Sequence, residues 1–292
     1  MLKEFKDCPV CQGNHFTHFL NCTDHTTTQE QFNIVTCDDC GFKFTNPYPA
    51  NLAAYYKDES YISHTNKAQN LTQRIYKIAR KYTLGQKEKM VSGLSDGRKI
   101  LDFGCGTGHF LNKCAESGWQ VQGLEPSDQA RSQHGPLLQG KIVNSIDLLS
   151  DEKVDIITLW HVLEHIEALN ETLDKLRQKL CSTGKLLLAV PNAASLDAKI
   201  YQEHWAAYDL PRHLYHFEPQ TMALLAKKHG FKISAQKPMK LDSFYVSLLS
   251  EEYKTGKQNY LPAFMAGLKS NLAARKDNNY SSLIYILEHE SK

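Results

Sequence analysis

A glycine-rich segment between two acidic residues is the part of the sequence best suited to bind a ligand. Residues 99–126 read as a buried strand, a turn containing Gly104, Gly106 and Gly108, an amphipathic helix, and a second strand that ends at Glu125. Glycines let the backbone approach a ligand closely because they carry no Cβ. Ligands of open α/β sheets bind outside the carboxyl ends of the strands, so we expect a binding site at this turn.

The residues around the turn disfavour a phosphate-containing ligand. The mononucleotide pattern GxxxxGK(S/T) is absent, and the dinucleotide pattern GxGxxG fails because residue 109 is histidine. Two acids, Asp102 and Glu125, flank the turn instead. Asp102 can attract an ammonium or sulfonium group, and Glu125 can accept two hydrogen bonds from a ribose diol. S-adenosylmethionine carries both groups and is the ligand that these acids predict.

Four of the eight cysteines form two closely spaced pairs, Cys8 with Cys11 and Cys37 with Cys40. Two such pairs supply the four thiolates of a closed, tetrahedral Zn²⁺ shell, which is the shell of a structural site. A ribbon of about 45 residues is too small to hold a core unaided, so the metal would hold its fold. The alternative is two unrelated redox or free-thiol pairs. Three further candidate ligands lie between the pairs: His15, His18 and Cys22.

Charge is distributed unevenly, although the net charge is only +2. Residues 1–50 carry three lysines and six acids, whereas residues 66–99 carry nine lysines or arginines and two acids. An acidic ribbon opposes phosphate binding, so we expect no nucleic-acid partner. The basic stretch contains an amphipathic helix at about residues 65–84. Its Arg74 is a candidate contact for an anionic ligand group, with a solvated helix face as the alternative.

Strands alternate with helices over most of the chain, which is typical of an α/β fold with a doubly wound parallel sheet. The expected strands after the first two are residues 141–144, 154–160, 185–190, 231–236 and 281–287, and the expected helices are 170–180 and 218–230. We divide the chain into a ribbon (1–50), a connector with basic helix (51–97) and an α/β domain (98–292) with a helical insertion at about 238–278. The sequence shows no apolar run of spanning length and no signal core, so we expect a cytoplasmic protein without a membrane partner.

Three motifs, in order and spacing, resemble those of class I S-adenosylmethionine-dependent methyltransferases. Residues 100–108 (ILDFGCGTG) resemble their motif I, and Glu125 matches their ribose-binding acid. Residues 160–166 (WHVLEHI) are similar to the signature after the fourth strand in the ubiquinone-biosynthesis O-methyltransferase-like branch. The resemblance covers about residues 98–237 and the last strand. It implies a Rossmann-like sheet of seven strands with the last strand antiparallel, next to a small N-terminal zinc ribbon.

The resemblance also implies roles for individual residues. The implied cofactor-binding residues are Asp102, Gly104, Cys105, Gly106, Glu125, Pro126, Ser145, Ile146, Trp160 and His161, with Arg74 added from the basic helix. Relatives often bind the adenine amino group with an acid after the third strand, and here Ser145 and Asp147 both stay open for that role. In the quinone branch, carboxylates and the histidine of the LEH motif can hold a divalent cation. Glu164 and His165 match that motif, and His161 stands where an acid is often found.

Methyl transfer to a hydroxyl group requires a base, and histidine has a pKa near neutrality. The candidate catalytic residues are His165, His213 and His161; helix capping or packing is the alternative role for each. His204 and His216 are weaker candidates, and Trp205 and Tyr208 could form an aromatic wall for an acceptor.

The ribbon and the segment DLPRHLYH (209–216) resemble a bacterial subgroup associated with methylation of sugars, polysaccharides and secondary metabolites. We therefore expect a methyltransferase that acts on an oxygen or carbon atom of a small-molecule acceptor. One alternative is an rRNA or tRNA methyltransferase whose zinc ribbon binds the substrate. A second is a non-catalytic cofactor-binding protein of the same fold.

Overall fold

The computed structural model describes residues 1–56 and 71–290, and it describes side chains in the first long helix only from residue 81 onward. The chain forms two compact units. The first comprises Met1–Tyr61, His161–Asp174 and Leu188–Lys292, and the second comprises Ile62–Trp160 and Lys175–Leu187. The sequence-based division at residues 50 and 97 stays a prediction, since these units follow different boundaries.

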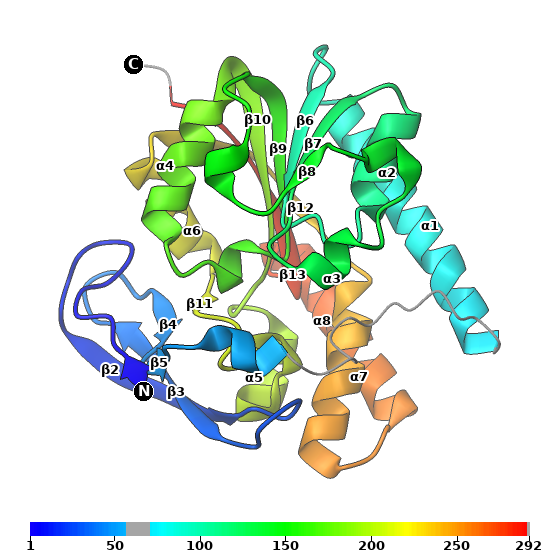
Figure 1. Ribbon diagram of the computed structural model, residues 1–292. Helices are drawn as coiled ribbons and strands as arrows, with labels where there is room; N and C mark the ends of the chain where they lie inside the picture. The colour runs from blue at the N-terminus through cyan, green and yellow to red at the C-terminus, as the bar shows by residue number, and fades with distance from the viewer. Residues whose placement is uncertain (57–70, 291–292) are drawn as a thin grey trace. The chain divides into compact units, whose positions relative to one another are not determined.

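A seven-stranded sheet has the strand order β12-β13-β10-β9-β6-β7-β8 (Figure 1). Its strands are β6 (Lys99–Phe103), β7 (Gln120–Leu124), β8 (Ile142–Val143), β9 (Val154–Trp160), β10 (Leu180–Pro191), β12 (Phe231–Pro238) and β13 (Ser282–His289). β6 pairs in parallel with β7 and β9, β7 pairs in parallel with β8, and β12 pairs antiparallel with β13. The predicted doubly wound α/β fold with a closing antiparallel strand is confirmed.

The helices connect these strands in the expected alternation. The α-helices are α1 (Leu71–Ser92), α2 (His109–Glu116), α3 (Asp128–Arg131), α4 (Leu169–Lys179), α5 (Leu196–Tyr201), α6 (Pro219–Lys228), α7 (Asp242–Thr255) and α8 (Tyr260–Asp277). The 3₁₀ turns are η1 (Leu52–Tyr56), η2 (Pro136–Leu138), η3 (Ile146–Leu148), η4 (Leu163–His165), η5 (Gln202–His204) and η6 (Ala206–Tyr208). The described residues include no helix long and apolar enough to span a bilayer.

In the second unit, β6 and β9 are buried along most of their length because they are central parallel strands rich in branched apolar residues. Leu111 and Cys114 of α2 are fully buried, which confirms the apolar stripe expected on this helix. The strand expected at residues 185–190 begins earlier, since β10 starts at Leu180. Glycine suits position 184 of this strand, because a Cβ there would lie 2.9 Å from Leu180 Cδ2 and 3.0 Å from the Cys181 carbonyl oxygen.

In the first unit, a four-stranded sheet has the order β11-β4-β3-β2. Its strands are β2 (Phe16–Thr23), β3 (Gln31–Cys37), β4 (Lys43–Thr45) and β11 (Tyr215–His216), while β1 (Leu2–Lys3) pairs with β5 (Tyr48–Pro49). Tyr215 pairs with Phe44, and His216 pairs with Lys43. The rings of Phe42, Phe44 and Tyr215 stack with centroids about 6 Å apart. The ribbon therefore completes its sheet with a strand from far along the chain.

Candidate functional site

The turn after β6 has the backbone geometry that glycine alone adopts readily. Gly104, Gly106 and Gly108 have φ values of 73°, 53° and 75°. The Gly104 and Cys105 amides donate to the Leu124 carbonyl at 2.7 and 3.0 Å, which fixes the turn against the end of β7. Within the described structure, a Cβ on Gly106 would meet no atom within 4 Å, so the space beside this glycine is open.

The Glu125 side chain lies across this turn. Its Oε2 accepts from the Gly106 amide and its Oε1 accepts from the Ser127 amide, each at 2.9 Å. His134 donates from Nε2 to the Gly106 carbonyl at 2.9 Å, a contact that the sequence did not predict. The carboxylate and the glycine backbone thus form one hydrogen-bonded cradle at the carboxyl ends of β6 and β7. Pro126 directly follows the carboxylate.

Asp102 lies beneath the cradle and is almost completely buried. The Thr158 hydroxyl on β9 donates to its carboxylate at 2.6 Å. Burial raises the pKa of Asp102 to about 7, while the bond from Thr158 and the nearby Lys87 oppose this shift. A buried carboxylate whose charged form is disfavoured is stabilised by a cation that binds beside it.

Trp160, at the end of β9, packs its ring edge-to-face with Phe110 of α2, with centroids 5.4 Å apart. The ammonium group of Lys87 lies 4.1 Å from the centre of the Trp160 ring. The sequence identified Trp160 but missed Lys87. Only its place among the basic residues of α1 hinted at a role.

The residues after β8 form the short 3₁₀ turn η3. The Ser145 hydroxyl accepts from the Asp147 amide at 3.3 Å and so begins η3, which contains Ile146. The Asp147 carboxylate is largely exposed and accepts from Lys175 at 2.9 Å. The side chain of Arg74 lies outside the described residues, as do the positions 65–70 of the predicted basic helix.

A cluster of ionisable side chains lies in the first unit around the LEH motif. Glu164, His165 and His213 each offer a ligand atom, and these atoms lie within 4.8 Å of one another. Glu164 is fully buried, and neither of its carboxylate oxygens has a hydrogen-bond partner among the described residues. Burial of a carboxylate is costly unless positive charge lies nearby, so the groups around Glu164 matter.

His161 provides the nearest positive charge. Its Nδ1 lies 3.4 Å from Glu164 Oε1, and its Nε2 donates to Asp242 Oδ2 at 3.1 Å. Burial opposes protonation of His161, but the hydrogen bond to Asp242 and the negative charges of Asp242 and Glu164 raise its pKa to about 9. In turn, His161 holds the pKa of Glu164 below its usual range against the effect of burial. A histidine protonated at neutral pH is a poor proton acceptor, which argues against His161 as the base.

The two other histidines keep an acceptor nitrogen available. His213 donates from Nδ1 to the Ala207 carbonyl at 2.9 Å, and His165 donates from Nδ1 to the Arg212 carbonyl at 3.1 Å. Because a carbonyl oxygen only accepts, the Ala207 contact leaves Nε2 of His213 as the acceptor nitrogen of a neutral ring. The Tyr56 hydroxyl also contacts Nδ1 of His165, at 2.9 Å. Burial and the neighbouring His213 lower the pKa of His165 to about 4. Carbonyl oxygens that orient imidazoles in this way are typical of metal-binding or catalytic histidines.

The weaker candidates do not join this cluster. His216 is buried, and its Nε2 lies 3.2 Å from the Thr45 hydroxyl. His204 lies near Glu203. Trp205 and Tyr208, the possible aromatic wall, are each only 2% exposed and pack edge-to-face, which favours the alternative of ordinary packing. Their roles are those of packing residues.

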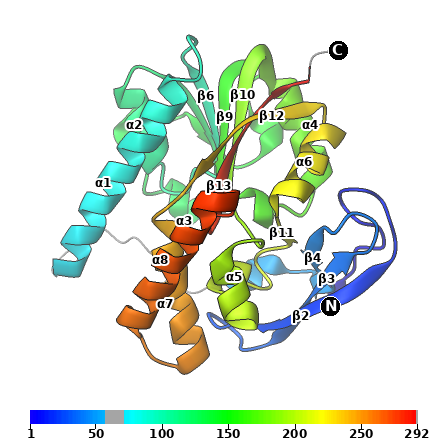
Figure 2. The same ribbon diagram turned by 180° about the vertical axis from the view of Figure 1, so that it is seen from behind.

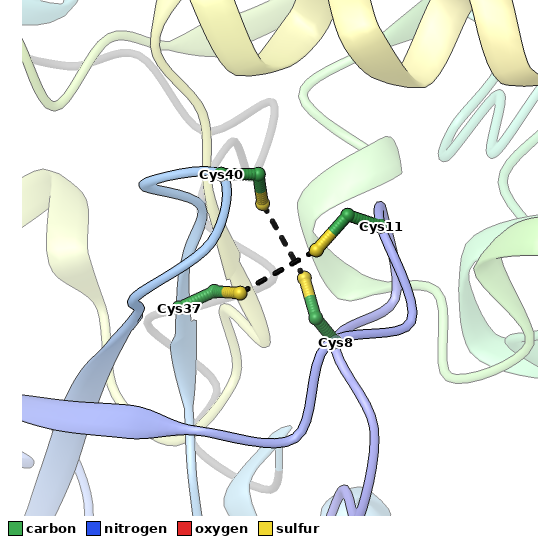
Figure 3. A group of neighbouring side chains, drawn as sticks. All are labelled: Cys8, Cys11, Cys37 and Cys40. Carbon is green, nitrogen blue, oxygen red and sulfur yellow. Dashed lines mark hydrogen bonds between the residues drawn. The ribbon is translucent and has the colours of Figure 1, made fainter.

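Figure 3 shows the four cysteines of the ribbon converging on one point. The Cys8 and Cys40 sulfurs lie 3.6 Å apart, and the Cys11 and Cys37 sulfurs lie 3.5 Å apart. A tetrahedral Zn²⁺ with Zn–S bonds of about 2.3 Å requires sulfurs about 3.8 Å apart, so this donor set fits the metal. His15, His18 and Cys22 do not belong to the group.

A comparison with protein families identifies the family of the chain. A family model described as a methyltransferase domain matches residues 71–236, which is more than half of the chain. The chain belongs to this methyltransferase family. The predicted resemblance is thereby confirmed, and the protein is an S-adenosylmethionine-dependent methyltransferase.

Individual methyltransferases show the same relationship. An uncharacterized methyltransferase of Geobacillus kaustophilus is 30% identical over 166 residues, which are 50% of this chain and 76% of the relative. The mitochondrial ubiquinone biosynthesis O-methyltransferase of Schizosaccharomyces pombe is 30% identical over 103 residues, which are 32% of this chain and 38% of that protein.

A solved structure shares the fold. The structure of magnesium protoporphyrin IX methyltransferase from Synechocystis with bound SAH has a TM-score of 0.52 at 14% identity, over 81% of this chain and 97% of the other. At this identity the likeness supports the fold and no statement about the acceptor.

Proposed function

We propose that this methyltransferase acts on an oxygen or carbon atom of a small-molecule acceptor, such as a sugar, a polysaccharide precursor or a secondary metabolite. The observation that carries the proposal is the buried group of Glu164, His165 and His213, in which two imidazole nitrogens and an unbonded carboxylate face one another. Such a group suits a reaction in which a hydroxyl or an acidic C–H bond loses its proton.

In this proposal the cradle of the second unit holds the cofactor. When bound, S-adenosylmethionine supplies a methyl group already activated on a sulfonium sulfur. The Gly104–Gly106 backbone and Cys105 would border its methionine portion, Glu125 and Pro126 its ribose, and Asp102 would stabilise its positive charge. Ser145 and Ile146 would border the adenine, with Trp160 and the adjacent His161 at the wall. Arg74 remains an untested candidate contact.

His213 is the base that we assign. Its Nδ1 donates its hydrogen to the Ala207 carbonyl, so Nε2 can accept a proton. That proton is the one that the methyl acceptor loses when the methyl group bonds to the acceptor. We expect His213→Ala to lower turnover about 100-fold or more and to leave cofactor affinity unchanged. Single-turnover methyl transfer and calorimetric cofactor binding measure the two effects. Loss of cofactor binding would instead contradict the assignment.

A divalent cation is a second candidate occupant of this group. Glu164, His165 and His213 supply three ligand atoms with carbonyl-oriented imidazoles, which is a suitable donor set. There the cation would lower the pKa of the acceptor hydroxyl. Activity that survives exhaustive chelation would favour the base, whereas activity restored by added Mg²⁺ or Mn²⁺ would favour the cation.

Two alternative functions can be separated by one experiment. An rRNA or tRNA methyltransferase would transfer tritiated methyl groups to RNA, and a non-catalytic cofactor-binding protein would transfer them to no acceptor. We expect incorporation into small molecules of a cell extract after RNA and protein have been removed. The acidic balance of residues 1–50 supports this expectation over RNA.

We also propose that Cys8, Cys11, Cys37 and Cys40 hold one structural Zn²⁺, as the spacing of their sulfurs allows. A cytoplasmic location stays a prediction from the sequence.

A further inference from the structure

The helices α7 and α8 form a hairpin (Figure 2). Its buried positions are mostly small residues: Ser243, Val246, Ser247 and Ser250 on α7 and Ala263, Gly267, Ser270 and Ala274 on α8. A Cβ on Gly267 would lie 3.0 Å from the Ser243 carbonyl oxygen, so the two helices approach closely. Small residues therefore occupy the inner side of the hairpin.

Large apolar side chains occupy its outer side. On α8, Leu261 is 71% exposed, Phe264 52%, Met265 50% and Leu272 46%. These positions recur at helical spacing and so form one stripe. On α7, Phe244 stacks on Phe264 with centroids 5.3 Å apart. The exposed residues Leu261, Phe264, Met265 and Leu272 are called here the hairpin face.

The charges around the hairpin face have mostly one sign. Residues 243–250 and 258–268 carry no charge at all. Seven exposed cations lie within residues 237–277, all of which are described: Lys237, Lys240, Lys254, Lys257, Lys269, Arg275 and Lys276. Asp277 is the one exposed acid in this segment; its other acids are half-buried. At 100° per residue, Lys269, Arg275 and Lys276 project on the side of α8 that carries the apolar stripe.

We propose that the hairpin face binds the surface of an anionic lipid bilayer. An exposed apolar helix face bordered by lysines inserts its side chains at the boundary of headgroups and acyl chains while the cations contact the phosphates. Soluble proteins rarely expose so many large apolar side chains on one element without a binding role. This inference does not depend on the identity of the methyl acceptor.

A second copy of the chain is the competing occupant of this face. An isologous interface brings the same surface patch of two subunits together. Lys269, Arg275 and Lys276 of the two copies would then lie near one another, and Asp277 is the one exposed acid of residues 237–277 that could pair with them. An anionic bilayer supplies the negative charge that a second copy lacks, so the distribution of charge favours the lipid surface.

Co-sedimentation of the full chain with lipid vesicles tests the proposal. We expect binding to vesicles of equal parts phosphatidylcholine and phosphatidylglycerol, weaker binding at high salt, and little binding to phosphatidylcholine alone. Phe264→Ser should weaken partitioning about ten-fold through lost apolar burial, and Lys269→Glu at least about five-fold through lost attraction. Cofactor binding by each variant verifies that it is folded.

Matched substitutions on α6 serve as controls. Leu224 is 45% exposed and Lys227 is also exposed, so Leu224→Ser and Lys227→Glu change similar side chains away from the hairpin face and should bind vesicles like the unaltered protein. Failure of the unaltered protein to bind anionic vesicles, equal binding to neutral vesicles, or undiminished binding by Phe264→Ser would each overturn the proposal. The proposal would also be overturned if sedimentation velocity showed a dimer that Phe264→Ser converts to a monomer while vesicle binding stays unchanged.

Discussion

Glu125 holds the glycine turn through both carboxylate oxygens, which accept from the Gly106 and Ser127 amides. In the proposed complex the same carboxylate would accept from the ribose hydroxyls, since a carboxylate has about four acceptor sites. One side chain would thus both shape the cradle and recognise the cofactor.

Replacement of this carboxylate should weaken cofactor binding. We expect Glu125→Ala to reduce the affinity for S-adenosylmethionine by about 1.5–3 kcal/mol, the contribution of hydrogen bonds to a charged group. Isothermal titration calorimetry measures the change. Glu116→Ala, at the exposed end of α2, is the control that should bind like the unaltered protein. Equal affinity in Glu125→Ala would contradict the role of Glu125.

Asp102 links folding stability to pH. Its pKa of about 7 in the folded protein exceeds the value near 4 in an unfolded chain, so the folded form binds the proton more tightly. Stability therefore falls as the pH rises from about 4 to about 7, where the buried carboxylate ionises. We expect Asp102→Asn to resist urea better than the unaltered protein above about pH 7 and to bind S-adenosylmethionine more weakly. If Asp102→Asn shifted the urea midpoint by the same amount at every pH, this assignment would be contradicted. Asp147→Asn, at an exposed site, is the control and should show no such dependence on pH.

Arg212 connects the segment before β11 to the loop between β2 and β3. Its guanidinium donates to Asp24 at 3.1 Å and to Asp209 at 2.6 and 3.0 Å, and Arg212 and Asp24 are almost completely buried. The Arg212 carbonyl also accepts from His165, so the ion cluster fixes the backbone that orients a proposed ligand or base.

Removal of this guanidinium should destabilise the first unit strongly. Arg212→Met would leave two carboxylates in the interior without their cation, and we expect a loss of about 3–5 kcal/mol in the free energy of unfolding. Lys3→Met breaks an exposed ion pair with Glu167 and should leave stability nearly unchanged. Urea denaturation of both variants makes the comparison, and similar midpoints would show that the buried cluster does not stabilise the fold.

The ribbon should depend on its metal. We expect about one zinc per folded chain, and we expect Cys37→Ser to release it and unfold the ribbon, because the metal supplies the binding energy that folds so small an element. Elemental analysis and near-ultraviolet circular dichroism measure the two effects. Cys181→Ser, outside the group of four, should retain the metal. A metal-free preparation with an intact ribbon would refute the proposal.

The sequence predicts best those elements that are specified by a pattern of neighbouring residues. β6, the glycine turn, α2 and β7 follow directly from apolar runs and closely spaced glycines, and the boundaries of β9 were predicted to the residue. Contacts between distant segments carry no such local signal. No local pattern could place Lys87 over Trp160 or Asp242 against His161, because each pair is separated by more than 70 residues.

At the scale of the whole molecule, a ligand that binds only the folded state stabilises it by mass action. At a concentration 100 times its dissociation constant, S-adenosylmethionine should add about 2.7 kcal/mol of stability and raise the melting temperature by roughly 5 °C. Differential scanning fluorimetry measures this shift. The Glu125→Ala variant should show a smaller shift at the same concentration; an equal shift would place the stabilising contacts elsewhere.

The sheet order β11-β4-β3-β2 also has a consequence for the chain during its synthesis on the ribosome, because the strands of this sheet are made at very different times. Both cysteine pairs and three strands of the ribbon emerge early, but Tyr215, which pairs with Phe44, follows about 170 residues later. At the usual speed of translation this delay lasts roughly 10–35 s. During that interval the edge of β4 lacks its partner strand, and such open edges are prone to pair with other chains. Early capture of a metal ion by the cysteines would keep the unfinished ribbon compact until its last strand arrives.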